Sequence, residues 1–162
     1  MAIHSFRRTQ VVTASIEKCW SFFSNPRNLA LITPPSLDFK VLSELGDAIH
    51  PGMMIEYRVR PLPFLGIPIT WLTEITGVRE PFYFVDEQRV GPYRIWHHEH
   101  TFRDAGNGRT EIGDLVHYVL PFSPFSEIIH PLLVQPQLRQ IFAFREKKVA
   151  ELFGESGADE AI

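Results

Sequence analysis

The sequence predicts an α+β domain in which a curved antiparallel sheet of seven strands wraps one long C-terminal helix. Three observations favour this class. Residues 137–153 repeat apolar side chains with a helical period, most of the preceding chain alternates apolar and polar residues as strands do, and the earlier helical signals are short. Antiparallel sheets with helices gathered on one face are typical of α+β domains.

The long helix is predicted over residues 137–153. Pro136 stands just before it, where a missing N–H costs nothing, and Gly154 stands just after it, where a glycine commonly ends a helix. Its apolar side chains fall within one stripe about 120° wide, which is expected to face the core. The stripe contains Leu138, Ile141, Phe142, Val149, Leu152 and Phe153.

Arg145 interrupts this stripe. In one interpretation its aliphatic stem packs on the core while its guanidinium reaches water. In the other, the side chain enters an internal cavity and meets an acid there, because a buried charge without a partner is costly.

A first strand is predicted at residues 3–13, followed by two short helices. Thr13 or Ser15 caps the first helix, and Asn25 caps the second, which ends before Pro34. Six further strands are then expected at residues 37–43, 53–60, 67–75, 82–88, 93–103 and 109–120. Seven strands curling round a helix leave an elongated space of the kind that binds small ligands.

Composition restricts the class of protein. The chain has 162 residues and a net charge of −3, which predicts a single domain over residues 1–154 and argues against nucleic-acid binding. No apolar run approaches the roughly 20 residues of a membrane helix, and Cys19, the single cysteine, excludes an internal disulfide. We therefore expect a cytoplasmic protein with a flexible tail at residues 155–162.

The most informative stretch is the predicted strand at residues 93–103. Because side chains on a strand alternate between faces, His98 and His100 share a face with Trp96 and Phe102, which we expect to be the inner one. Residues 106–108 are expected to form a three-residue hairpin. That hairpin places His100 opposite Asp114, His98 opposite Val116 and Trp96 opposite Tyr118.

Three interpretations of the two histidines remain open. They form a satisfied polar network with Asp114 or Arg145; they bind a metal ion with Asp114, His117 or Glu74 as a third ligand; or they contact a bound ligand as hydrogen-bond donors or acid–base groups. We assign neither a metal site nor a cofactor. No nucleophile elbow, phosphate loop or dinucleotide fingerprint is present, so hydride and phosphoryl transfer have no support.

Several spaced motifs resemble the bacterial ligand-binding SRPBCC proteins of the START-like superfamily, which also includes polyketide cyclases and birch-pollen allergens. The resemblance extends from Phe6 to Phe153 and implies a helix-grip fold, without implying one activity. It is carried by ITPP at 32–35, WLTEI at 71–75, FVDEQ at 84–88, GPY at 91–93 with Trp96, His98, His100 and Phe102, DLVHYVLP at 114–121, and IFAFR at 141–145.

We therefore expect a site for a small hydrophobic molecule such as a lipid, a quinone or a polyketide-like compound. One alternative is a cyclase or dehydratase in which His98 and His100 with Asp114 move a proton, and another is a homodimeric interaction module that uses the loop at residues 61–66. The expected aromatic walls are Tyr57, Trp71, Phe84, Trp96, Tyr118 and Phe142, and the expected polar contacts are Gln88, His98, His100, Asp114 and Arg145.

Overall fold

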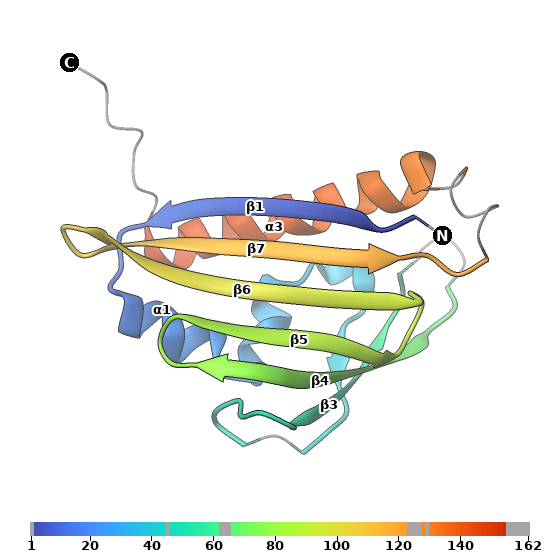
Figure 1. The fold of residues 1–162 in the computed structure, drawn as a ribbon, viewed down its shortest axis with the longest axis horizontal. Helices are drawn as coiled ribbons and strands as arrows, with labels where there is room; N and C mark the ends of the chain where they lie inside the picture. Colours follow the sequence, from blue (N-terminus) through green and yellow to red (C-terminus); the bar gives the residue numbers. More distant parts are fainter. Residues whose placement is uncertain (1, 45, 62–65, 123–127, 129, 155–162) are drawn as a thin grey trace.

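The predicted α+β architecture is confirmed. The structure is a computed structural model that describes residues 2–44, 46–61, 66–122, 128 and 130–154. A seven-stranded antiparallel sheet curves along one long helix, and short helical segments follow the first strand (Figure 1). Most of the loop at residues 61–66 and the whole tail at 155–162 lie outside the described residues, so the homodimer contact and the flexible tail stay predictions.

Strands that are neighbours in the sheet are antiparallel and follow one another in the chain, except that the first strand pairs with the last. The strands are β1 His4–Val12, β2 Lys40–Val41, β3 Met54–Val59, β4 Ile69–Arg79, β5 Tyr83–Val90, β6 Ile95–Gly106 and β7 Arg109–Val119. Their order in the sheet is β1-β7-β6-β5-β4-β3-β2, so the first and last strands of the chain lie side by side. This arrangement places β7 between β1 and β6 (Figure 1).

The two short helices are present, although the second is a 3₁₀ helix. Ser15, rather than Thr13, caps α1 (Ile16–Phe23) by accepting a hydrogen bond from the Lys18 amide, and Asn25 caps η1 (Pro26–Ile32). The prediction of a strand over residues 37–43 is largely wrong. A second 3₁₀ turn, η2 (Pro35–Leu37), and the left-handed backbone of Asp38 occupy its first half, which leaves only the two residues of β2.

The long helix α3 (Gln135–Phe153) continues from a π-helical segment, η4 (His130–Val134). Its buried face is Leu138, Phe142, Arg145, Val149 and Phe153. Leu152, which we expected in the buried stripe, is 44% exposed because it lies at the edge of that stripe near the end of the helix. Among the described residues, no helix is long and apolar enough to span a membrane.

The β6–β7 register is confirmed, although the turn differs from the expected one. Asn107 and Gly108 form a two-residue turn with positive φ angles, which only a few residue types tolerate. Gly106 therefore pairs with Arg109, and a bulge between Asp104 and Gly106 restores the expected pairing. Beyond the bulge, His100 faces Asp114, His98 faces Val116 and Trp96 faces Tyr118.

An aromatic cluster joins α1, the sheet and the end of α3. The rings of Trp20, Phe23, Phe84, Phe102 and Phe153 pack together there, mostly edge-on or tilted. Cys19 is fully buried beside this cluster, and burial raises the pKa of its thiol. Both facts indicate that Cys19 is a small packing residue and not a reactive thiol.

Two leucines of α3 test the observed helix face. Leu138 is 3% exposed and Leu152 is 44% exposed. Leu138→Ala is expected to lower the free energy of unfolding by about 2–5 kcal/mol, because it leaves a cavity. Leu152→Ala, on the solvent side of the same helix, is expected to change it by less than about 0.5 kcal/mol. Urea denaturation of both variants measures the difference, and equal losses would contradict this face assignment.

Candidate functional site

A cavity of about 480 Å³ lies between the inner face of the sheet, η1 and α3. Its lining is predominantly apolar, with a small polar group on one side, which is the usual character of a small-molecule site. Most of the side chains expected at the site line this cavity. They are Tyr57, Trp71, Phe84, Trp96, His98, His100, Phe142 and Arg145.

Three expected site residues do not line the cavity. The Gln88 side chain donates a hydrogen bond to the Tyr93 carbonyl (2.6 Å) and accepts one from the Tyr93 amide, so it closes the β5–β6 turn. The Tyr118 hydroxyl lies 2.7 Å from His130 Nε2, beside His4. Asp114 sits behind the two histidines, where it contacts them without facing the cavity.

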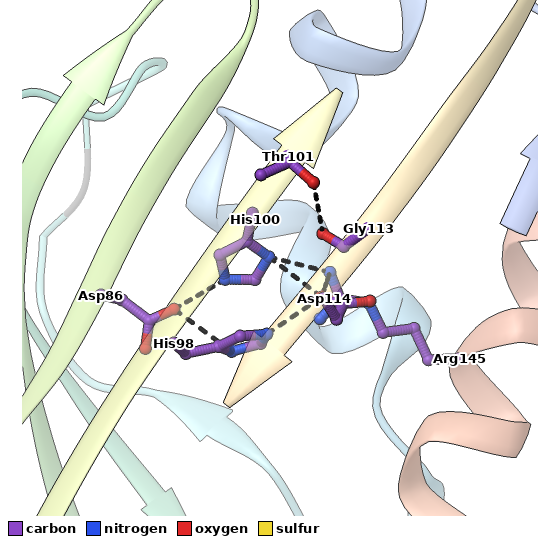
Figure 2. Close-up of polar contacts among 7 residues, drawn as sticks. All are labelled: Asp86, His98, His100, Thr101, Gly113, Asp114 and Arg145. Carbon is purple, nitrogen blue, oxygen red and sulfur yellow. Dashed lines mark hydrogen bonds and ion pairs between the residues drawn. The ribbon is translucent and has the colours of Figure 1, made fainter. Parts of the chain in front are cut away.

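Five ionisable side chains from four elements converge at the polar side of the cavity (Figure 2). Asp86 comes from β5, His98 and His100 from β6, Asp114 from β7 and Arg145 from α3. Strand register produces this cluster, because Asp86 pairs with His98 across β5–β6 and His100 pairs with Asp114 across β6–β7. Residues that share the inner face of adjacent strands are thereby brought within contact distance.

Each imidazole lies between the two carboxylates. His98 places Nε2 2.9 Å from Asp114 Oδ1 and Nδ1 3.4 Å from Asp86 Oδ2. His100 places Nε2 2.7 Å from Asp86 Oδ2 and Nδ1 3.3 Å from Asp114 Oδ1. The centroids of the two rings are 3.8 Å apart. Each ring therefore has one nitrogen facing Asp86 and the other facing Asp114.

Arg145 is buried and paired, so the interpretation in which its guanidinium reaches water is wrong. Only 8% of the residue is exposed, and its Nη2 lies 3.1 Å from Asp114 Oδ1 and 3.1 Å from His100 Nδ1. Its guanidinium also lies over the rings of Phe23 and Phe142. The helix therefore supplies the positive charge that the buried Asp114 requires.

Burial and pairing set the protonation of the cluster. Burial raises the pKa of Asp114, but the Arg145 charge and hydrogen bonds from both histidines outweigh it and hold that pKa well below its usual value. Burial also raises the pKa of Asp86, but the two histidines outweigh this effect and lower that pKa below its usual value. Burial, together with the neighbouring His100, lowers the pKa of His98. The carboxylates are therefore charged at neutral pH and His98 is neutral.

Asp86 is the contact that sequence reasoning missed. Asp86 lies two residues after Phe84 and therefore on the same strand face, so strand alternation carries a usable signal for it. Its pairing with His98 was hidden because β5 and β6 are joined by a turn at residues 91–94 whose geometry does not follow a two-residue hairpin rule. The sequence also gave no sign that η1 residues such as Leu29 and Ile32 line the cavity.

The lowered pKa values predict that acid destabilises the fold. A carboxylate with a lowered folded-state pKa adds stability above its unfolded value, and this is lost as pH falls through the folded value. His98 acts in the same direction, because protonation below its ordinary pKa of 6.5 favours the unfolded chain.

Urea denaturation from about pH 7.5 to about pH 3 should therefore show a fall in the free energy of unfolding that begins near pH 6.5 with His98 and continues below the ordinary carboxyl pKa of 3.8 with Asp86 and Asp114. His98→Gln should flatten the part of the curve just below pH 6.5. Leu152→Ala, which removes no ionisable group and lies on the exposed side of α3, serves as the control and should leave the curve parallel to that of the wild type. An unchanged slope in His98→Gln would show that this imidazole is not buried in neutral form.

Comparison with known proteins identifies the fold. No protein-family model matches the sequence, and no curated protein matches it. Solved structures do match over nearly the whole chain. A START superfamily protein from Mycobacterium smegmatis has a TM-score of 0.67 at 14% identity, covering 92% of this chain and 99% of its own. A protein from Arthrobacter aurescens has a TM-score of 0.68 at 12% identity, with 98% and 93% covered.

A plant enzyme has the same architecture. Norcoclaurine synthase from Thalictrum flavum, in complex with dopamine and hydroxybenzaldehyde, matches with a TM-score of 0.64 at 15% identity, over 93% of this chain and 88% of that one. At such identities the likeness concerns the fold and not the activity. The chain therefore has the START-like helix-grip fold, as its sequence resemblance to that superfamily implied.

Proposed function

We propose that this protein binds a small, largely apolar molecule carrying one polar group, as a carrier in the cytoplasm. The observation that supports the proposal is the cavity of about 480 Å³, which lies within the range of known small-molecule sites. A lipid chain, a quinone or a polyketide-like compound has the required chemistry. Norcoclaurine synthase, which has the same fold, was solved in complex with dopamine and hydroxybenzaldehyde, and this is consistent with such a role.

Aromatic side chains would supply most of the binding free energy. Trp71 and Trp96 meet edge to face at 5.3 Å between centroids, and Tyr93 packs against both. Flat rings of this kind bury large areas against a bound molecule while losing little conformational entropy. A planar or chain-like apolar ligand therefore fits this wall better than a strongly charged one.

Polar selectivity would come from the opposite side of the cavity. His98 and His100 are 5% exposed each, and both reach the cavity surface together with Asp86. A hydroxyl or carbonyl on the ligand would replace water at these groups. Because each imidazole nitrogen already faces a carboxylate oxygen, such a ligand group would add a polar contact at the cavity surface beyond those within the cluster.

A proton-transfer enzyme of the cyclase or dehydratase type is the second candidate. The observation that favours it is the pair of imidazoles held between Asp86 and Asp114 at the cavity surface. A neutral imidazole oriented by a carboxylate is suited to accept a proton from a bound substrate. Asp114 would be a positioning residue, because the histidines separate it from the cavity.

Ligand binding can be tested with two leucines of η1. Leu29 lines the cavity, whereas Leu31 is 57% exposed on the same segment. Leu29→Trp should fill the cavity and weaken binding of the neutral fluorescent probe N-phenyl-1-naphthylamine by about tenfold or more, equivalent to about 1.4 kcal/mol. Leu31→Trp should bind the probe as the wild type does.

Native mass spectrometry of protein purified from its own host should also detect a copurifying apolar molecule in the wild type and less of it in Leu29→Trp. Equal probe affinity in both variants would place binding outside the cavity and overturn the proposal.

Catalysis is separated from binding by replacing the histidines singly. With a polyketide-like substrate, His98→Gln or His100→Gln should lower kcat by about 10²–10⁴-fold if an imidazole moves the proton. Substrate affinity should change much less, because the aromatic wall is intact. Stopped-flow turnover and equilibrium binding measure the two quantities. No turnover by the wild type, together with a loss of affinity in the histidine variants, would favour the carrier over the enzyme.

A further inference from the structure

We propose that Asp86, His98 and His100 form a binding site for a divalent first-row transition metal ion, such as Zn²⁺ or Fe²⁺, in the wall of the cavity. The sequence-based metal hypothesis considered Asp114, His117 or Glu74 as the third ligand. The structure instead brings Asp86 to the two histidines, on the side of the imidazoles that faces the cavity. Metal binding and apolar ligand binding are independent proposals, because neither needs the other.

The donor atoms suit such an ion. One carboxylate oxygen and two imidazole nitrogens lie within 4.8 Å of one another. Bond lengths of about 2.0–2.2 Å require neighbouring ligand atoms to be roughly 2.9–3.4 Å apart. Asp86 Oδ2 is 2.7 Å from His100 Nε2 and 3.4 Å from His98 Nδ1, so an ion placed among the three atoms would replace the Asp86–His100 hydrogen bond. Two histidines and one carboxylate are a common set for Fe²⁺ or Zn²⁺ with open positions.

The opposite nitrogens of both rings meet a second acid. His98 Nε2 lies 2.9 Å and His100 Nδ1 3.3 Å from Asp114 Oδ1. Metal-binding histidines usually donate their other N–H to a carboxylate or carbonyl, which selects the tautomer and orients the ring. His98 has this arrangement, because its Nδ1 faces Asp86 while its Nε2 faces Asp114. His100 Nδ1 also accepts a hydrogen bond from Arg145 Nη2 at 3.1 Å, so metal binding through His100 Nε2 requires that contact to be exchanged for a hydrogen bond from His100 Nδ1 to Asp114.

Charge supports the same assignment. Two carboxylates, Asp86 and Asp114, meet a single guanidinium, Arg145, so the acidic side chains outnumber the permanently charged basic one. The side chains of Asp114, Arg145 and both histidines are each no more than 10% exposed. A buried net charge is costly unless a counter-ion compensates it. A cation between Asp86 and the histidines would supply that compensation.

A second histidine–carboxylate group on the outer face provides a matched control. His97 Nδ1 lies 2.9 Å from Glu87 Oε1, on the same two strands and one residue away from His98 and Asp86. The His97 side chain is about one-third exposed beside Glu87 and Glu99, and Arg89 already pairs with Glu87. Its cross-strand neighbour His117 is 6.4 Å away between ring centroids, against 3.8 Å for His98 and His100, so this group has similar residue types without closely spaced imidazoles.

The test is a titration of the full-length, chelator-treated protein with Co²⁺, followed by its visible d–d absorption, with Zn²⁺ competition and elemental analysis. The wild type should bind about one ion per chain and release it on adding excess Zn²⁺. Asp86→Asn, His98→Gln and His100→Gln should each weaken Co²⁺ binding by at least about tenfold, and Asp114→Asn by about 10–100-fold. Glu87→Gln and His97→Gln should bind Co²⁺ as the wild type does.

Two further measurements keep the outcome clear. Circular dichroism establishes which variants are folded. Adding Zn²⁺ should raise the Tm of the wild type and leave the Tm of the folded ligand variants unchanged, which reports the site without an absorption band. Leu29→Trp should keep the metal site while losing the apolar probe, so failure of one proposal is distinguishable from failure of the other. Binding below about one-tenth of an ion per chain, or binding that both histidine variants retain, would overturn the metal site.

Discussion

The contact between Arg145 and Asp114 is the constraint on which the polar side of the cavity depends. A guanidinium in the middle of an apolar helix face is tolerable only if a negative charge meets it, and removing one partner of such a buried pair typically costs about 3–5 kcal/mol. Because Arg145 belongs to α3 and Asp114 to β7, this requirement sets the position of the helix on the sheet. Asp114, held in this way, orients both imidazoles of β6.

The same group connects two apolar regions. One lies around α1, with Phe23, Phe84 and Phe102, and the other lies around Trp96, Tyr118 and Phe142. His100 stacks on Phe84 at 4.0 Å between centroids, His98 meets Phe142 edge-on, and Arg145 lies over Phe23 and Phe142. The polar cluster thus packs as part of the interior while one side of it faces the cavity. A ligand in the cavity would touch aromatic wall and charged group at once.

The fold alone does not select among a carrier, an enzyme and a metal-binding protein. The START-like architecture provides a hollow between sheet and helix, and the side chains that line it decide the chemistry. Here those side chains are a broad aromatic wall and a compact set of two imidazoles with two acids. The first suits an apolar molecule, and the second suits a proton, a polar ligand atom or a metal ion.

Local periodicity was enough to determine the α+β class, the long helix, most strands and the inward face of β6, because side-chain direction follows directly from residue spacing. The β6–β7 register was also available, since a short turn links two adjacent strands and restricts their pairing. Tertiary structure alone decided that Asp86 meets the histidines, that Arg145 is buried against Asp114, and that Gln88 and Tyr118 lie away from the cavity. The Arg145–Asp114 contact joins elements far apart in the chain, and the others depend on how the sheet curves and how its turns and the helix lie, which no local pattern encodes.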